Sequence, residues 1–286
     1  MPDVLPALAP DVLVRGDGAP AAICLQCATP LVGAYCHACG QHESVADRLT
    51  FRSLWRDFRK RRLNLDRGLF RTLLDVVRRP GAVADAFVEG RRQTYTHPIT
   101  LLFVVYAVYA LLLSVIGDRV DGMMMDQFER QLAARPVDDA ELAAFMDAYL
   151  DGVIEAFHLF YTYGAYFAVF MILPFALACR WLLGDRGRTL AECAVLGAYI
   201  EVAVVLPSML VFTPLSAALG NQWIGSAGLL LYVGYAAWSA RGFFDRRLST
   251  AALSAFSMVL ALVVYFGAVI GGSILYGAVV AIQAMG

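Results

Sequence analysis

The chain has 286 residues, of which 59% are hydrophobic and 16% are charged, and its formal net charge is −1. A mean hydropathy of +0.62 with so few charges excludes an ordinary soluble domain and predicts that most of the chain lies in lipid. The small net charge gives no sign of a polyanionic partner for the chain as a whole, although the charges are unevenly distributed.

The first residues contain neither the basic region nor the continuous apolar core of a secretory signal. They are rich in Pro, Asp and Gly, a composition that does not support a packed core. We therefore expect residues 1–22 to be a disordered lead.

Residues 23–43 contain two CxxC pairs separated by eight residues: Cys24, Cys27, Cys36 and Cys39. Each CxxC turn directs two thiolates to one point, so the spacing predicts a structural zinc site (Zn) in a small ribbon-type hairpin. We expect a tight turn at Gly33 and a positive φ at Gly40. Disulfides, a redox or iron site and metal-free cysteines are the alternatives. Four thiolates complete a tetrahedral shell, so the site is predicted to be structural or partner-binding rather than catalytic.

Residues 48–97 are predicted to form cytoplasmic helices that are amphipathic and basic. The first has one apolar face, made by Phe51, Leu54, Trp55 and Phe58. Basic side chains surround that face: Arg52, Arg56, Arg59, Lys60 and Arg62. This composition is typical of a helix on an anionic membrane surface, which makes membrane lipids the expected partners. Packing on the ends of the spans is the alternative. Nucleic acid is disfavoured because the arginines follow the helix and not the ribbon.

Residues 98–286 are predicted to form a transmembrane bundle. Five stretches are long and apolar enough to span a bilayer: 99–116, 156–178, 190–212, 223–240 and 252–282. An outer amphipathic helix is expected over residues 138–150. We expect the last stretch to be one tilted helix, with a break at Gly271 and Gly272 as the alternative.

The distribution of charge predicts the orientation. Residues 1–98 carry 14 basic and 10 acidic side chains, whereas residues 118–155 carry 3 basic and 10 acidic ones. The positive-inside rule therefore places the N-terminus in the cytoplasm and the C-terminus outside, in a bacterial inner membrane. Because cytoplasmic thiols stay reduced, this orientation favours metal over disulfides at the cysteines.

Two acidic residues lie in the third predicted span. Glu201 is near its middle, and Glu192 is about 13 Å away on the opposite face of an ideal helix. Glu201 is either a proton or cation relay, or a hydrogen-bonded carboxyl that ties helices together. Candidate partners of Glu201 are tyrosines: Tyr199, Tyr232, Tyr235 and Tyr265.

Three segments in order resemble a known family: "CLQCATPLVGAYCHACGQ", "DRGLFRTLLDVVRRPG" and "FVEGRRQTYTHPITLLF". Together, over residues 24–110, they are similar to the bacterial membrane proteins of domain of unknown function 3667. The resemblance implies a CxxC ribbon at the four cysteines, an Arg-Pro-Gly turn at 79–81 and a basic segment at 90–92. Arg91 stands where lysine is commoner, and Ala28 where glycine often follows the first pair. The family has no assigned activity to transfer.

The sequence contains no nucleophile elbow, P-loop, dinucleotide fingerprint or HExxH motif. We therefore expect a non-enzymatic, all-α polytopic membrane protein with about five transmembrane helices, whose zinc ribbon and basic helices form a docking or sensing platform. A protein partner at the ribbon and an oligomer are compatible with this hypothesis. The alternative is a small permease or ion-coupled transporter that uses Glu201, with the ribbon as a regulatory cap, although no inverted repeat is evident.

Overall fold

The structure, a computed structural model, is helical throughout the bundle, and in its described part the only bridges are isolated ones near the cysteines. This confirms the predicted all-α class. The predicted lead, residues 1–22, lies outside the described part. The described residues are 23–42, 49–61, 68–112, 114–115, 140–162, 168–219 and 222–285.

The central helix of the bundle is α8 (Leu190–Pro207). Every residue from Ala191 to Leu206 is buried, and α8 packs against other helices on several sides. Its side chains are apolar around most of its circumference, as is typical of a helix enclosed by others. Beyond Pro207 the chain continues through a π-helical turn, Ser208–Phe212, into α9 (Thr213–Leu219).

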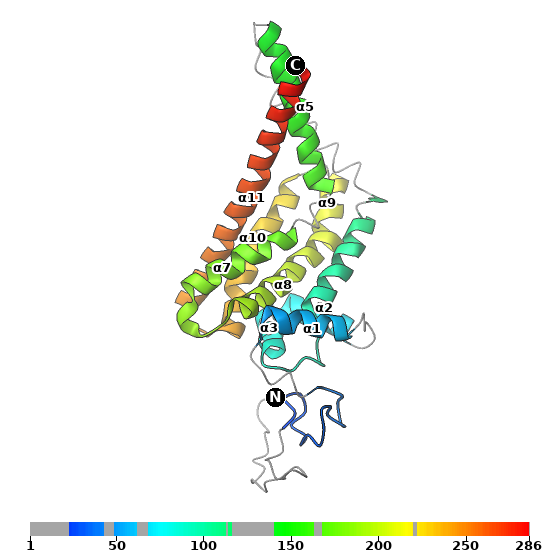
Figure 1. Cartoon of the computed structure of the whole chain (residues 1–286), viewed down its shortest axis with the longest axis vertical. Coiled ribbons are helices and arrows are strands. Elements are labelled where there is room, and N and C mark those ends of the chain that lie inside the picture. Colours follow the sequence, from blue (N-terminus) through cyan, green and yellow to red (C-terminus); the bar gives the residue numbers. More distant parts are fainter. Residues whose placement is uncertain are drawn as a thin grey trace.

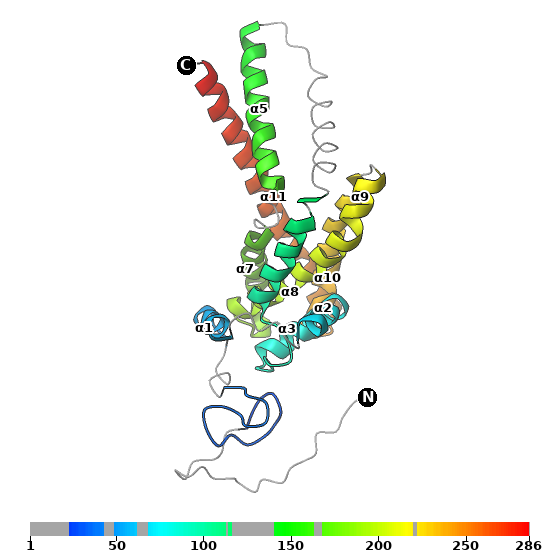
Figure 2. The ribbon, with the colours of Figure 1, turned by 90° about the vertical axis from the view of Figure 1, so that its right-hand side faces the viewer.

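Further helices complete the bundle around α8 (Figure 1). They are the helix Pro98–Leu112, α7 (Ile172–Leu182), α10 (Gln222–Phe243) and α11 (Leu248–Met285). Within α11 the helix is continuous through Gly271. Three short helices lie at the lower end of the bundle, and the cysteine-rich segment lies below them (Figures 1 and 2). These three are α1 (Phe51–Arg61), α2 (Leu69–Arg78) and α3 (Pro80–Val88).

A close contact between α3 and α10 fixes this lower layer. A Cβ atom at Gly81 would lie 2.8 Å from the Ser239 carbonyl carbon, and one at Gly242 would lie 2.9 Å from the Ala82 nitrogen. Pro80 occupies the first turn of α3, where its missing N–H is tolerated. The Arg-Pro-Gly turn thus starts α3 and allows its backbone to touch α10.

The helix α5 (Ala140–Thr162) packs along α11. Gly152 and Gly277 bring the two backbones together, since a Cβ at Gly152 would be 2.8 Å from the Gly277 Cα. This pair extends away from the bundle at the end opposite the ribbon (Figure 1). The structure therefore has one helix where the sequence suggested an outer helix over 138–150 and the start of a span over 156–178.

Among the described residues, two helical stretches are long and apolar enough to cross a membrane: Leu190–Ser216 and Leu248–Ala284. The count of five spans is thus not confirmed and stays a prediction. The apolar window of α11 is 22% buried, against 72% for the central stretch. Because soluble proteins rarely expose continuous apolar surfaces of this kind, α11 supports membrane association. Its 38 residues correspond to about 57 Å, more than the roughly 30 Å of a bilayer core.

Candidate metal centre and buried carboxyl

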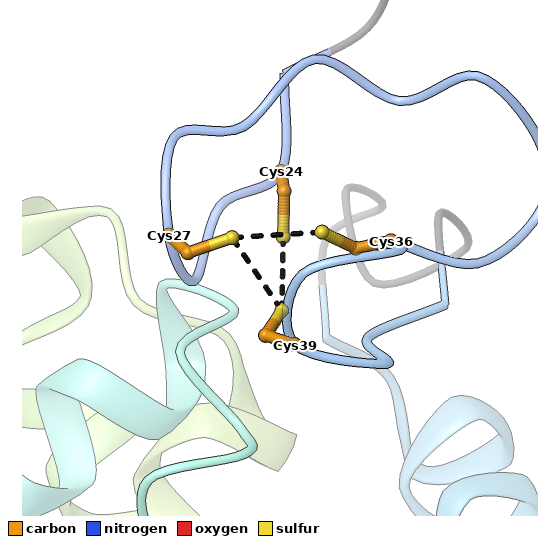
Figure 3. A group of neighbouring side chains, drawn as sticks. All are labelled: Cys24, Cys27, Cys36 and Cys39. Carbon is orange, nitrogen blue, oxygen red and sulfur yellow. Dashed lines mark hydrogen bonds between the residues drawn. The ribbon is translucent and has the colours of Figure 1, made fainter.

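The predicted metal ligands come together in the structure. The four Sγ atoms lie within 4.8 Å of one another, and Figure 3 shows them directed at a common centre. Three Sγ pairs are separated by 3.5–3.6 Å: Cys24–Cys39, Cys27–Cys36 and Cys27–Cys39. Sulfurs around a tetrahedral ion with bonds of about 2.3 Å are about 3.8 Å apart. The four cysteines therefore fit a tetrahedral metal ion, and none of them forms a disulfide.

The two cysteine pairs sit in turns of matching geometry, twelve residues apart. The Cys24 N–H donates to the Thr29 carbonyl at 2.9 Å, and the Cys36 N–H donates to the Gln41 carbonyl at 2.8 Å. Isolated bridges at the ends of the turns replace the ladder expected for a hairpin; they are Ile23–Pro30 and Tyr35–His42. Each turn is thus closed by its own backbone bonds.

The residue after each CxxC pair has a left-handed backbone. Gly40 has φ +74°, as predicted, and Ala28 has φ +57°. Glycine adopts this conformation readily, whereas alanine does so at a cost of about 1 kcal/mol. The tight turn expected at Gly33 needs no positive φ, since Gly33 is absent from the described glycines that have one.

Hydrogen bonds and burial act differently on two of the thiols. Contacts with the Thr29 hydroxyl and backbone N–H lower the pKa of Cys27 from 9.0 to about 6. Burial raises the pKa of Cys39 to about 12, although the Gln41 N–H opposes this shift. N–H groups that bond to sulfur are the usual support of a thiolate that binds a metal, and a bound cation favours the thiolate form further.

Gln26, between Cys24 and Cys27, connects the metal centre to the helical body, which means the short helices α1 to α3 and the bundle above them. Its Nε2 donates to the Thr94 Oγ1 at 2.6 Å, and its Oε1 accepts from the Gln93 N–H at 3.2 Å. Both amide ends of the side chain are therefore satisfied by one segment of the body. No sequence pattern indicates this role, because a glutamine inside a CxxC turn has no particular spacing to a distant loop.

The segment that receives Gln26 is itself held in the core. Arg92 is 2% exposed, and its guanidinium bonds to Asp57 of α1 at 2.5 Å. The Thr96 N–H donates to the Thr72 hydroxyl at 2.9 Å, and the Thr96 carbonyl accepts from Tyr199 of α8 at 2.9 Å. The segment 91–97 thus connects the metal centre with α1, α2 and the central helix.

The apolar face of α1 is divided in the structure. Leu54 is buried, and Phe58 stacks against Phe103 with ring centroids 6.3 Å apart. Phe51 and Trp55 remain about half exposed. The predicted lipid-binding arginines of the described part are exposed on the same helix: Arg52, Arg56 and Arg59. The side chain of Lys60 and the whole of Arg62 lie outside the described part.

Glu201 is enclosed at the centre of the bundle, with 1% exposure. Its Oε1 accepts from the hydroxyls of Tyr106 and, at 2.9 Å, Tyr232. Tyr232 was among the predicted partners and Tyr106 was not, because Tyr106 lies 95 residues from Glu201 in the sequence. The hydroxyls of two other candidates bond elsewhere: Tyr199 to the Thr96 carbonyl and Tyr235 to the Val77 carbonyl.

Glu192 lies at the start of α8, where it forms a capping box with Thr189. The Thr189 N–H donates to the Glu192 carboxylate at 2.9 Å, and the Glu192 N–H donates to the Thr189 hydroxyl at 3.2 Å. The T-x-x-E spacing carries this signal in the sequence. The structure does not bring Glu192 and Glu201 together as hydrogen-bonded partners in the described part.

Comparison with known proteins identifies one family segment. Residues 66–110 match the family described as protein of unknown function (DUF3667), which confirms the resemblance to domain of unknown function 3667. The matched segment contains α2, α3, the loop that receives Gln26, and Tyr106; the cysteines precede it. No curated protein and no solved structure matches the chain.

Proposed function

We propose that this chain, with its DUF3667 segment, is a non-enzymatic membrane protein of the bacterial inner membrane that serves as a docking or sensing platform. In this proposal a zinc ion at the four cysteines shapes the ribbon, and the ribbon and basic helices face the cytoplasm. The observation that best supports this proposal is the pair of hydrogen bonds between the Gln26 side chain and residues 93 and 94.

The position of Gln26 supports a link between metal binding and the helical body. It lies between Cys24 and Cys27, so its backbone is positioned by the turn that holds two ligands. Structural zinc sites supply folding free energy to small segments that have little core of their own. Loss of metal is therefore expected to release Gln26 and, with it, residues 93 and 94 of the loop.

The short helices support a membrane surface beside the ribbon. On α1, Phe51 and Trp55 are exposed next to arginines, and on α2, Phe70 is 85% exposed beside Arg71. Figure 2 shows α1 and α2 on opposite sides of the lower end of the bundle. Exposed aromatic and basic side chains together favour the surface of an anionic leaflet.

The test uses the full-length protein in nanodiscs with anionic lipid. Metal content would be measured together with hydrogen exchange in the segment 91–97. We expect the double variant Cys24→Ser/Cys27→Ser to lose both the metal and the protection of the Gln93 amide from hydrogen exchange. Gln26→Ala should keep the metal but lose the protection of the Gln93 amide. Gly33→Ala is the matched control, since a Cβ at Gly33 meets nothing within 4 Å.

Crosslinking in cells with mass spectrometry of the captured proteins tests the platform itself. The proposal requires at least one partner that is captured by the wild type and by Gly33→Ala, and that is lost in both the cysteine variant and Gln26→Ala. Retention of every partner by the metal-free cysteine variant would contradict it.

A further inference from the structure

The carboxyl of Glu201 is satisfied on one oxygen only. Tyr106 and Tyr232 both donate to Oε1. Oε2 is fully buried and has no hydrogen-bond partner among the described residues. A carboxyl used solely to tie helices would be expected to engage both oxygens, because an unpaired buried acceptor costs about 1–3 kcal/mol.

The surroundings of Glu201 contain hydroxyls and no counter-charge within the part of the chain that is described. Tyr106 comes from the helix Pro98–Leu112, Tyr232 from α10, and Tyr265 of α11 also interacts electrostatically with the carboxyl. The other helices packed on α8, namely α2, α3 and α7, contribute no described titratable group that interacts with Glu201. An ionised carboxylate is costly in such a place unless a cation accompanies it.

The number of oxygen atoms without a protein partner at Glu201 indicates which cation the site can bind. Hard metal ions need about six or more oxygen ligands, whereas a proton needs one. At this site a single carboxylate oxygen lacks a protein partner. We therefore propose that Glu201 is a proton-binding site, in which Oε2 carries the proton while Tyr106 and Tyr232 donate to Oε1.

The same contacts allow the proton to be released. Burial favours the neutral carboxylic acid, and the two hydroxyl donors favour the carboxylate, so each protonation state is stabilised by a different feature of the site. Toward α9, Tyr109 lies one turn beyond Tyr106, with its hydroxyl 3.4 Å from the Thr213 hydroxyl. Tyr109 also interacts electrostatically with Tyr232, so further hydroxyls lie near the site.

Infrared difference spectroscopy of the full-length protein in nanodiscs tests this proposal. During a pH titration that starts at about pH 6, where exposed Asp and Glu side chains are already ionised, we expect the carbonyl band of a protonated carboxylic acid, present at the start and reversibly lost at high pH. The band should be missing in Glu201→Gln. It should remain in Glu155→Gln, whose carboxylate accepts from Tyr276 in the α5–α11 pair outside the bundle.

A second variant keeps the carboxyl of Glu201, so the proposal can still be tested if Glu201→Gln fails to fold. Tyr232→Phe removes one donor that stabilises the carboxylate, so the band should persist to a higher pH than in the wild type. Replacing sodium and potassium by choline should leave the titration unchanged. A band that is absent at every pH, that survives in Glu201→Gln, or that does not change with pH would overturn the proposal. A titration shifted by sodium or potassium would assign the site to a metal cation and overturn it as well.

Discussion

Replacing Gly81 with alanine tests the closest approach between α3 and α10. The added Cβ would collide with the Ser239 carbonyl oxygen and would lie 2.8 Å from its carbon and 2.9 Å from the Ser239 Cα. Carbon atoms pack best at about 3.5–4.0 Å. The helices would therefore have to separate by at least about 0.7 Å, and no flexible side chain is available to absorb the change.

The separation would also weaken polar contacts across this interface. Arg188 bonds to Asp85 of α3 and, at 2.7 Å, to the Phe243 carbonyl of α10, so it connects the two helices that are forced apart. Overpacking of a rigid contact costs about 1–3 kcal/mol. We expect Gly81→Ala to lower the free energy of unfolding by about 3 kcal/mol, because the atoms that the new Cβ meets belong to the backbone.

Unfolding in mixed detergent micelles, followed by circular dichroism, measures this loss. The control is Gly271→Ala, because a Cβ at Gly271 in α11 meets nothing within 4 Å. Alanine should leave that variant unchanged or stabilise it by up to about 1 kcal/mol, as expected for a glycine inside a helix. If Gly81→Ala unfolds like the wild type while Gly271→Ala behaves as expected, the close contact between α3 and α10 is wrong.

Two further predictions concern the metal centre and the loop beside it. Gly40→Ala should weaken metal affinity by roughly 2- to 10-fold, because alanine disfavours φ +74° by about 1 kcal/mol. The control Gly33→Ala should leave the metal affinity unchanged. Equal affinities of the two variants in a competition titration would contradict the left-handed turn at Gly40. Asp57→Asn should destabilise the protein by about 1.5–3 kcal/mol in the same unfolding assay, since it removes a charged hydrogen-bond partner of the buried Arg92 guanidinium. The control is Glu89→Gln, which breaks the ion pair of Glu89 with Arg91, where about half of each side chain is exposed; it should cost less than about 1 kcal/mol. Similar losses of stability in Asp57→Asn and Glu89→Gln would show that burial does not govern these ion pairs.

Local patterns in the sequence predicted the features that depend on near neighbours. The spacing of Cys24 and Cys27 was sufficient to predict one half of the metal centre, because a CxxC turn positions its own thiols. The positive φ of Gly40 follows from the same kind of short-range rule. By contrast, α5 runs through the position where the sequence suggested separate helices, because packing against α11 stabilises a helix that carries charges such as Asp151.

By itself, the sequence determined the helical class, the four thiolates and the presence of a single acidic residue in the middle of the central span, because periodicity, spacing and apolar composition are properties of short segments. Only the tertiary structure decided that Gln26 bonds to residues 93 and 94, and that Tyr106 and Tyr232 share one oxygen of Glu201. These contacts join positions separated by 31 to 95 residues. The packing of the helices determines these partners, and the local propensities of the chain do not predict them.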